Sequence, residues 1–551
     1  MKKILYISAL LGALVSISTS CQKDPLEEVV YSSMTADIAF TTYENAEASI
    51  NSMYIPLHTI FEFHFSVFSD VPTDIAASQH HVNEDYLNDG MINDTWNINT
   101  VFQQFCKAYG RANVSIDEIT DMDDSLFEDQ EKSKDDLLAE AYFVRAFAYY
   151  NLTDIFYRVP LVTTSRLDVN EPQNLSSIED IEEVMEKDLQ TAAKNLPKSW
   201  PNTQGNRPTY GAAEGMLVRM YMRKAGRARC AGDEATANTY WQKALTEVNK
   251  VLALEGTEYE LLDDVFAPFD PATEETLYNK ELIWALRGSR SASEGGWSIG
   301  MYYSPWMFDT GWESINGTPE LAWMYDPEDM RYQKLLITDY QSVYGNPWYY
   351  KFPKSAEEIG TLSKVYDSEH QDIEVDVCWV YKYKHLYACC YYYQDPNNFP
   401  VMRLSDMILC KAEILNELNG PSAEALSYIN RIRERAFTNS EHNLVLSDYP
   451  DKASLRSAIC DERAMELCME GVRRSDLIRM GLWKDRMDKY IASIKNRAIW
   501  KARNAGHPDD YYADDYKPYP TDLTENDIRR YYPFPRREVE LNEDYANNRV
   551  F

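Results

Sequence analysis

Beyond its first 20 residues the sequence lacks a hydrophobic run long enough to span a bilayer, because no later stretch approaches the roughly 18 consecutive apolar residues that this needs. Basic residues are also scarce, with 55 Lys and Arg against 88 Asp and Glu and a formal net charge of −33. Such an acidic balance argues against a nucleic-acid partner. The nine cysteines form no CxxC pair and no dense disulfide framework, so most are expected to be buried small side chains.

The chain does have a leader that ends at a cysteine. Lysines at positions 2 and 3 precede an apolar run over 4–17 and the small residues 18–20, directly before Cys21. This layout resembles a bacterial lipoprotein signal. We expect residues 1–20 to be a cleaved signal peptide and Cys21 to become a lipid-anchored N-terminus, with ordinary secretion as the alternative.

Helical periodicity dominates two long regions of the remaining sequence, 21–255 and 401–551. Paired helices joined by short turns suggest tetratricopeptide-like hairpins. The expected fold class is therefore mainly α, with a tetratricopeptide-like helical-hairpin scaffold. The helices are expected at 133–156, 176–196 with a capping box begun by Ser176, 212–229, 236–254, 403–418, 421–436 and 454–470.

A third region, 256–400, breaks this pattern with Gly and Pro punctuation and short strand-like runs at 282–288 and 376–385. It is expected to be a large irregular insertion of loops and short strands, and loops on a rigid scaffold are common binding sites. Six of the 12 tryptophans gather within 65 residues of this region, at 284, 297, 306, 312, 323 and 348. Trp284 and Trp379 lie inside apolar runs, so we assign them to the core.

Several motifs follow one another in the order and spacing of a known family. They include AEAYFVRAFAYYNL (139–152), RPTYGAAEGMLVRMYMRKAG (207–226), MRLSDMILCKAEILNELNG (402–420), ICDERAMELCMEGVRRSDLIRMGLW (459–483) and YYPFPRREVELN (531–542). The chain resembles the SusD/RagB family of outer-membrane nutrient-binding lipoproteins. Glu462, Arg463, Glu466 and Glu470 in these motifs are spaced to form a partly buried charge network, so we interpret them as structural.

The resemblance implies a non-enzymatic, lipid-anchored receptor on the outer membrane that faces the cell exterior. It implies that the protein binds oligosaccharides or polysaccharides and delivers them to a SusC-like TonB-dependent outer-membrane transporter. It also implies ligand loops at 70–99 and 295–316. Exposed aromatic rings with polar neighbours suit sugars. The candidate glycan contacts are Asp70, Trp96, Asn99, Trp297, Tyr302, Tyr303, Trp306 and Trp312.

Three short patterns resemble catalytic or metal-binding motifs, but the residues around them do not match what those motifs require. The GWSIG pattern around Ser298 lacks the strand-to-helix turn of a nucleophile elbow. The cluster of His80, His81, Glu84 and Asp85 has no recognised ligand spacing, and the aspartates at 121–124 lack the rest of a calcium loop. We therefore predict no catalytic residue, metal or cofactor. Peptide binding and, less favoured, a surface glycosidase remain the alternatives to glycan capture.

Overall fold

The structure is a computed structural model that describes residues 40–78, 95–168, 171–201, 207–271, 278–289, 296–304, 312, 314–337, 340–341, 347–348, 378–383, 395–504, 506–510 and 531–547. Helices make up most of this part, and strands are few and short, as the sequence predicts. None of the helices described is both long and apolar enough to cross a membrane. Cys21 and the other leader residues lie outside the described residues.

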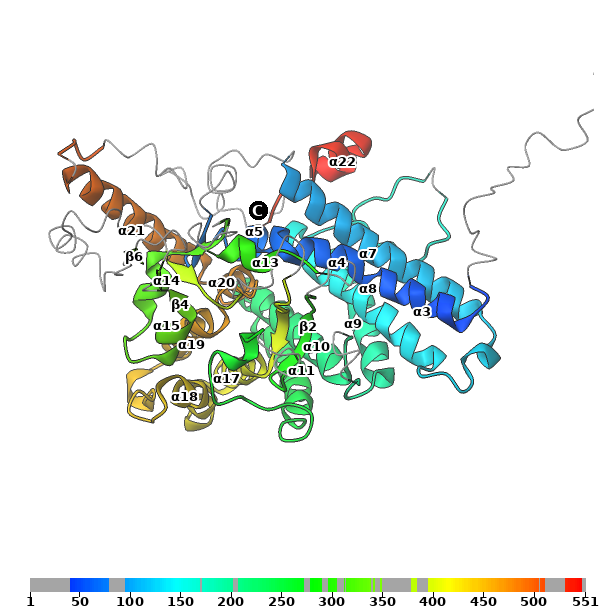
Figure 1. Ribbon diagram of the computed structural model, residues 1–551, viewed down its shortest axis with the longest axis horizontal. Helices are drawn as coiled ribbons and strands as arrows, with labels where there is room; N and C mark the ends of the chain where they lie inside the picture. Colours follow the sequence, from blue (N-terminus) through cyan, green and yellow to red (C-terminus); the bar gives the residue numbers. More distant parts are fainter. Residues whose placement is uncertain are drawn as a thin grey trace, which may run out of the picture.

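Helices α7 to α11 pack in chain order, each against the next, and α3 and α4 pack against α7. Figure 1 shows α3, α4, α7 and α8 running together to the right of the view. Small residues at the contacts, such as Ala141, Ala146 and Ala148 in α8, are fully buried and allow this close packing. The helices are α3 (Tyr43–Ser52), α4 (Tyr54–Thr59), the π-helix η1 (Ile60–His64), α5 (Phe65–Ser69), α7 (Trp96–Asp121), α8 (Lys134–Phe156), α9 (Ile178–Asn195), α10 (Tyr210–Cys230) and α11 (Glu234–Leu252).

The C-terminal helices continue the stack, because α17 packs against α11 and then against α18 and α19. They are α17 (Leu404–Asn419), α18 (Ala423–Phe437), α19 (Lys452–Leu467), α20 (Arg473–Arg479), α21 (Trp483–Asn504) and α22 (Arg536–Leu541). Helix α20 also packs against α5 and α10, which joins the end of the stack to its beginning. The paired arrangement agrees with the expected helical-hairpin scaffold.

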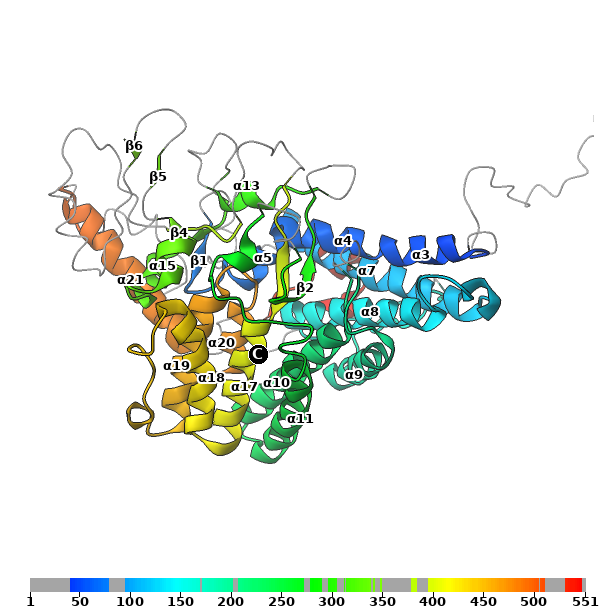
Figure 2. The same ribbon diagram turned by 60° about the horizontal axis from the view of Figure 1, so that its bottom comes forward.

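The insertion contributes short helices and strands on one side of the molecule. Figure 2 shows α13, β5 and β6 on the upper side, away from the lower ends of α11, α17 and α18. The strands pair antiparallel as β1 (Ala76–Ala77) with β3 (Asn316–Gly317), β2 (Leu282–Leu286) with β8 (Phe399–Arg403), β4 (Leu336–Ile337) with β7 (Trp379–Val380), and β5 (Tyr340–Gln341) with β6 (Pro347–Trp348). The short helices are α13 (Ile299–Tyr303), α14 (Pro319–Met324) and α15 (Met330–Leu335).

Helix boundaries follow local capping chemistry. Ser133 is the N-cap of α8, which begins where the sequence predicts, and it forms a complete capping box with Asp136. The cap of α9 is Ser177, whose side chain accepts from the Asp180 backbone N–H, so the prediction of Ser176 was wrong by one residue. The Ser176 hydroxyl instead accepts a hydrogen bond from the Leu161 N–H in the neighbouring loop.

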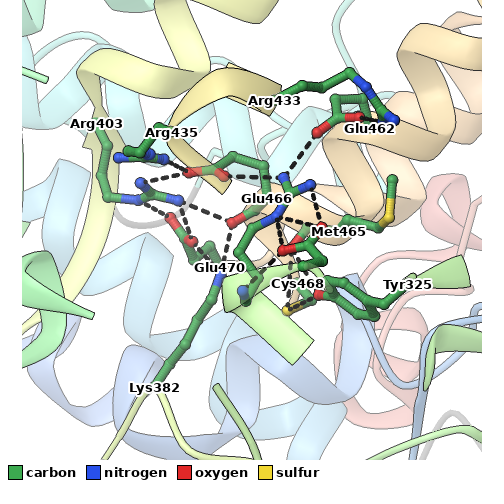
Figure 3. A network of polar contacts seen from close by, with 12 residues as sticks. Tyr325, Lys382, Arg403, Arg433, Arg435, Glu462, Met465, Glu466, Cys468 and Glu470 are labelled. Carbon is green, nitrogen blue, oxygen red and sulfur yellow. Dashed lines mark hydrogen bonds and ion pairs between the residues drawn. The ribbon is translucent and has the colours of Figure 1, made fainter. Parts of the chain in front are cut away.

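A buried network of ion pairs ties the C-terminal motifs together (Figure 3). Arg403 on β8 pairs with Glu470 at 2.8 Å and with Glu466 at 3.0 Å. Glu466 also pairs with Arg435 of α18, and Glu470 pairs with Lys382 at 2.6 Å. The surrounding guanidinium groups outweigh burial and hold the pKa of Glu466 far below its usual value. The predicted structural charge network is confirmed, and it is more deeply buried than expected.

Candidate binding site

The helical segment α4–η1–α5 places two neighbouring rings at one edge of the N-terminal helices. Within the π-helical turn, Phe61 points into the core and packs against Phe65, with ring centres 4.3 Å apart and the rings tilted by 32°. Phe63 and His64 follow, with their own ring centres 5.6 Å apart. A π-helical turn changes which side chains share a face, and such turns recur at functional sites.

These two rings belong to a continuous series that we call the aromatic row: Trp96, His64, Phe63, Tyr302 and Trp312. Trp96 meets His64 edge-on at 4.3 Å, and Phe63 stacks on Tyr302 at 4.5 Å with an interplanar angle of 22°. Tyr302 then meets Trp312 edge-on at 4.8 Å. The row thus joins η1, the first residue of α7, α13 and the segment after α13.

Exposure varies along the aromatic row in a way that suits contact with a ligand. Trp96 is 66% exposed, and no other Phe, Tyr or Trp whose side-chain burial the structure describes is as exposed. Tyr302 and Trp312 are half-buried, whereas Phe63 and His64 lie buried beneath them. The row therefore has a buried base and rings at both ends that solvent reaches.

Backbone contacts hold Tyr302 and Trp312 in place. The Trp312 N–H donates to the Met301 carbonyl at 2.7 Å, and the N–H groups of Ser314 and Ile315 donate to the Tyr302 carbonyl at 2.9 and 3.0 Å. The segment that follows α13 is therefore folded back against it. Rings fixed in this way lose little conformational entropy when a ligand stacks on them.

The start of α7 supplies polar groups beside Trp96. Thr95 caps the helix by accepting from the Ile98 N–H, and the Asn99 side-chain amide donates to the Thr95 carbonyl at 2.9 Å. The Asn97 side-chain oxygen lies 2.7 Å from Nδ1 of His64, so His64 carries a proton on that nitrogen. Burial lowers the pKa of His64, which leaves the ring neutral at pH 7.

Two carboxyl groups anchor α13 below the row. Glu62 accepts from the Ser298 N–H at 2.6 Å, and Asp395 accepts from the Gly300 N–H at 2.5 Å. Burial raises the pKa of Asp395 to about 6 and also raises the pKa of Glu62. Both groups act as acceptors for the α13 backbone, and α13 in turn carries Tyr302.

The predicted contacts that the structure describes divide into two groups. Trp96, Asn99, Tyr302 and Trp312 come together at the aromatic row, although they were drawn from two segments some 200 residues apart in the sequence. Pairing of β1 with β3 joins these segments. Trp306 lies outside the described residues.

Three other predicted contacts are buried. Trp297 is 2% exposed and its indole N–H donates to the Asn397 carbonyl at 2.8 Å. Tyr303 is also 2% exposed, and its hydroxyl lies 2.5 Å from that of Ser66. The Asp70 carboxylate accepts the backbone N–H groups of Gly471 and Arg473. Trp297 and Tyr303 therefore belong to the core, and Asp70 ties α5 to the turn before α20.

Sequence reasoning treated 70–99 as a ligand loop and missed both the helix α7 and the two buried rings of the row. Trp96 and Asn99 lie in the first turn of a 26-residue helix, which fixes their direction more firmly than a loop could. The run of aromatic residues and histidine over 60–65 was the available signal for Phe63 and His64. Its wider π-helical turn is not visible in the sequence.

The two tryptophans assigned to the core are buried, and two of the aspartates over 121–124 form ion pairs with basic side chains. Trp284 and Trp379 are buried, as predicted. Asp121 pairs with Arg166 at 2.5 Å and Asp124 pairs with Lys134 at 2.8 Å. His80 and its acidic neighbours lie outside the described residues.

Comparison with family models gives two matches along the chain. The model described as the SusD family matches residues 280–551, and the model described as "Starch-binding associating with outer membrane" matches residues 26–222. The SusD-like protein P25 of Formosa agariphila is 27% identical over 422 residues, which cover 72% of this chain and 71% of that protein.

Solved structures share the fold at lower sequence identity. A SusD homolog from Bacteroides thetaiotaomicron superposes with a TM-score of 0.70 at 21% identity, covering 92% of this chain and 97% of that one. A laminarin-binding SusD-like protein superposes with a TM-score of 0.64 at 19% identity, covering 91% of this chain and 98% of that one. These similarities extend over the helical scaffold and the insertion together.

Proposed function

The chain belongs to the SusD family, and from this we propose that it is a cell-surface receptor that binds oligosaccharides or polysaccharides and delivers them to a TonB-dependent outer-membrane transporter. The observation that carries the proposal is the aromatic row. A solved relative with the same fold binds laminarin, a glycan. We propose no enzymatic activity and no cofactor for this chain.

The geometry of the row suits a sugar ring. Pyranose rings have apolar C–H faces that stack on indole and phenol rings, and polar edges that need hydrogen bonds. Trp96 and Trp312 would supply the platforms at the two ends, with Tyr302 between them. Asn99 would bond to a hydroxyl group at the edge. Trp306 and the buried Asp70, Trp297 and Tyr303 carry no part of this proposal.

Modest affinity fits a receptor that passes its ligand on. An aromatic contact contributes about 1 kcal/mol and a neutral hydrogen bond about as much, so a few of them bind a glycan without trapping it. We propose that a lipid on Cys21 tethers the receptor beside its transporter, which raises the effective concentration of each partner. Mass measurement of the mature N-terminus tests the tether, since acyl chains should be attached to Cys21.

The binding test uses the soluble body, residues 22–551, titrated calorimetrically against laminarin, xyloglucan and starch. We expect at least one of them to bind, and Trp96→Ala or Trp312→Ala to weaken that binding roughly fivefold, because an aromatic contact contributes about 1 kcal/mol and about 1.4 kcal/mol would correspond to a factor of ten. Leu446→Ala is the matched control. It removes an apolar side chain that is 45% exposed in the 3-10 turn Leu446–Asp448 between α18 and α19, outside the elements that form the row.

The same titration separates the alternatives. Binding to a peptide mixture but to no glycan would favour peptide capture. Release of shortened products from a labelled oligosaccharide would favour a surface glycosidase. If a glycan binds but both tryptophan variants bind it as tightly as the unmodified protein, the aromatic row is not the site.

A further inference from the structure

The elements that form the aromatic row carry no cation. Residues 54–69, 95–106, 296–304 and 312–317 contain no Lys or Arg. Going along α7 from Trp96, the first basic residue is Lys107, three turns into the helix. An anionic ligand lying on the row would therefore find no guanidinium or ammonium group on these elements.

The histidines near the row do not replace the missing cation. His64 donates from Nδ1 to Asn97 and is buried, and His58 lies against the indole of Trp297 with ring centres 5.0 Å apart. Burial lowers the pKa of His58 to about 4 and lowers that of His64. Both rings are therefore neutral at pH 7.

The ionisable groups that do lie at the base of the row are acidic. Glu62 and Asp395 both bond to the α13 backbone, and the Glu62 charge is among the causes that raise the pKa of Asp395. The whole chain adds a net charge of −33 to this local field. Negative potential at a site repels ligands of the same sign, and the effect weakens as salt is added.

From this arrangement we propose that the aromatic row selects uncharged glycans and rejects glycans that carry carboxylate or sulfate groups. The proposal rests on the proposed function and narrows its substrate class. An anionic substituent at the row would lose hydration without a Lys or Arg on these elements to pair with, and the carboxyl groups of Glu62 and Asp395, which bond to the Ser298 and Gly300 N–H groups, add negative charge nearby. Specificity of this kind comes from penalising the wrong ligand as well as from contacting the right one.

The test compares matched forms of one glycan. Laminarin, xyloglucan and starch are each offered unmodified, carboxymethylated, and hydroxyethylated to the same degree, so that the hydroxyethyl form controls for added bulk. We expect the carboxymethylated form of the bound glycan to bind at least tenfold more weakly than the hydroxyethylated form at low ionic strength. We expect this gap to narrow as sodium chloride is added, because screening weakens the repulsion.

A gain-of-function variant sharpens the test. Asn99→Arg places a cation one turn from the start of α7, beside Trp96, and should raise affinity for the carboxymethylated form relative to the hydroxyethylated form. Ser427→Arg is the control, because it adds the same charge at an exposed position on α18, on the opposite side of the molecule in Figure 2. It should leave the ratio unchanged.

The outcomes separate the two proposals. Equal or tighter binding of the carboxymethylated form would overturn the selectivity while leaving the proposed function intact. A gap between the two forms that Ser427→Arg closes as well as Asn99→Arg does would assign the repulsion to net charge alone and overturn the role of the row. If no form of any glycan binds, the proposed function fails, and the selectivity fails with it.

Discussion

Asp70 shows how a residue picked for binding can serve the fold instead. Its carboxylate accepts from Gly471 at 2.8 Å and from Arg473 at 3.3 Å, and so joins two turns that are 401 residues apart or more. Sequence could suggest that the residue matters, because an acidic side chain after the apolar run of α5 is unusual. Whether it faced solvent depended on where α20 docks, and no local pattern encodes that long-range contact.

The pH dependence of stability tests this role. Burial raises the pKa of Asp70 to about 7 from its usual 3.8, so between these values the folded protein holds a proton that the unfolded chain has released. Stability conferred by this group is therefore full below about pH 4 and falls as pH rises toward 7. Urea denaturation measures the free energy of unfolding of the unmodified protein and of Asp70→Asn. The difference between the two should fall by on the order of a few kcal/mol as pH rises from about 4 to about 7. Parallel pH curves for the two proteins would contradict it.

The helices of the scaffold depend on glycine where two of them nearly touch. A Cβ atom on Gly226 of α10 would lie 2.5 Å from the Arg479 carbonyl oxygen, at the end of α20. Gly110 of α7 has no atom within 4 Å of the corresponding position. The sequence alone shows two glycines inside predicted or observed helices and does not tell them apart. Their difference arises from which helix packs against each.

The same substitution should therefore have opposite effects at these two positions. Gly226→Ala should lower the free energy of unfolding by about 1–3 kcal/mol, because α10 and α20 must move apart. Gly110→Ala should raise it by about 0.5–1 kcal/mol, because alanine favours the helix and meets no neighbour. Urea denaturation followed by circular dichroism measures both. A loss of stability at Gly110 as large as that at Gly226 would contradict the packing explanation.

Across the whole molecule, the three regions expected after the signal peptide all contribute to one large core, and a second, smaller cluster lies among α17, α18, α19, α20 and α21. That core includes residues of α3, α8, β2, α17 and the C-terminal tail. Trp284 of β2 meets Phe143 and Phe147 of α8 edge-on at 4.8 and 4.7 Å, which fixes the insertion to the N-terminal helices. The helical hairpins were predictable because their apolar periodicity is local. The docking of insertion and tail was not, because it depends on contacts between distant segments.

A shared core predicts that the molecule unfolds as one unit. Phe534, in the tail, lies between Phe102 and Phe156 at 5.3 and 5.4 Å, and the Tyr532 N–H donates to the Ile155 carbonyl. Phe534→Ala should cost about 3–5 kcal/mol through the cavity it leaves. We expect one calorimetric transition for the soluble body, and Phe534→Ala should move all of it to lower temperature. Leu541→Ala truncates a side chain that is 73% exposed in the same tail, and it should leave the transition temperature unchanged. If part of the transition stays where it was, the regions fold separately and the shared core does not couple them.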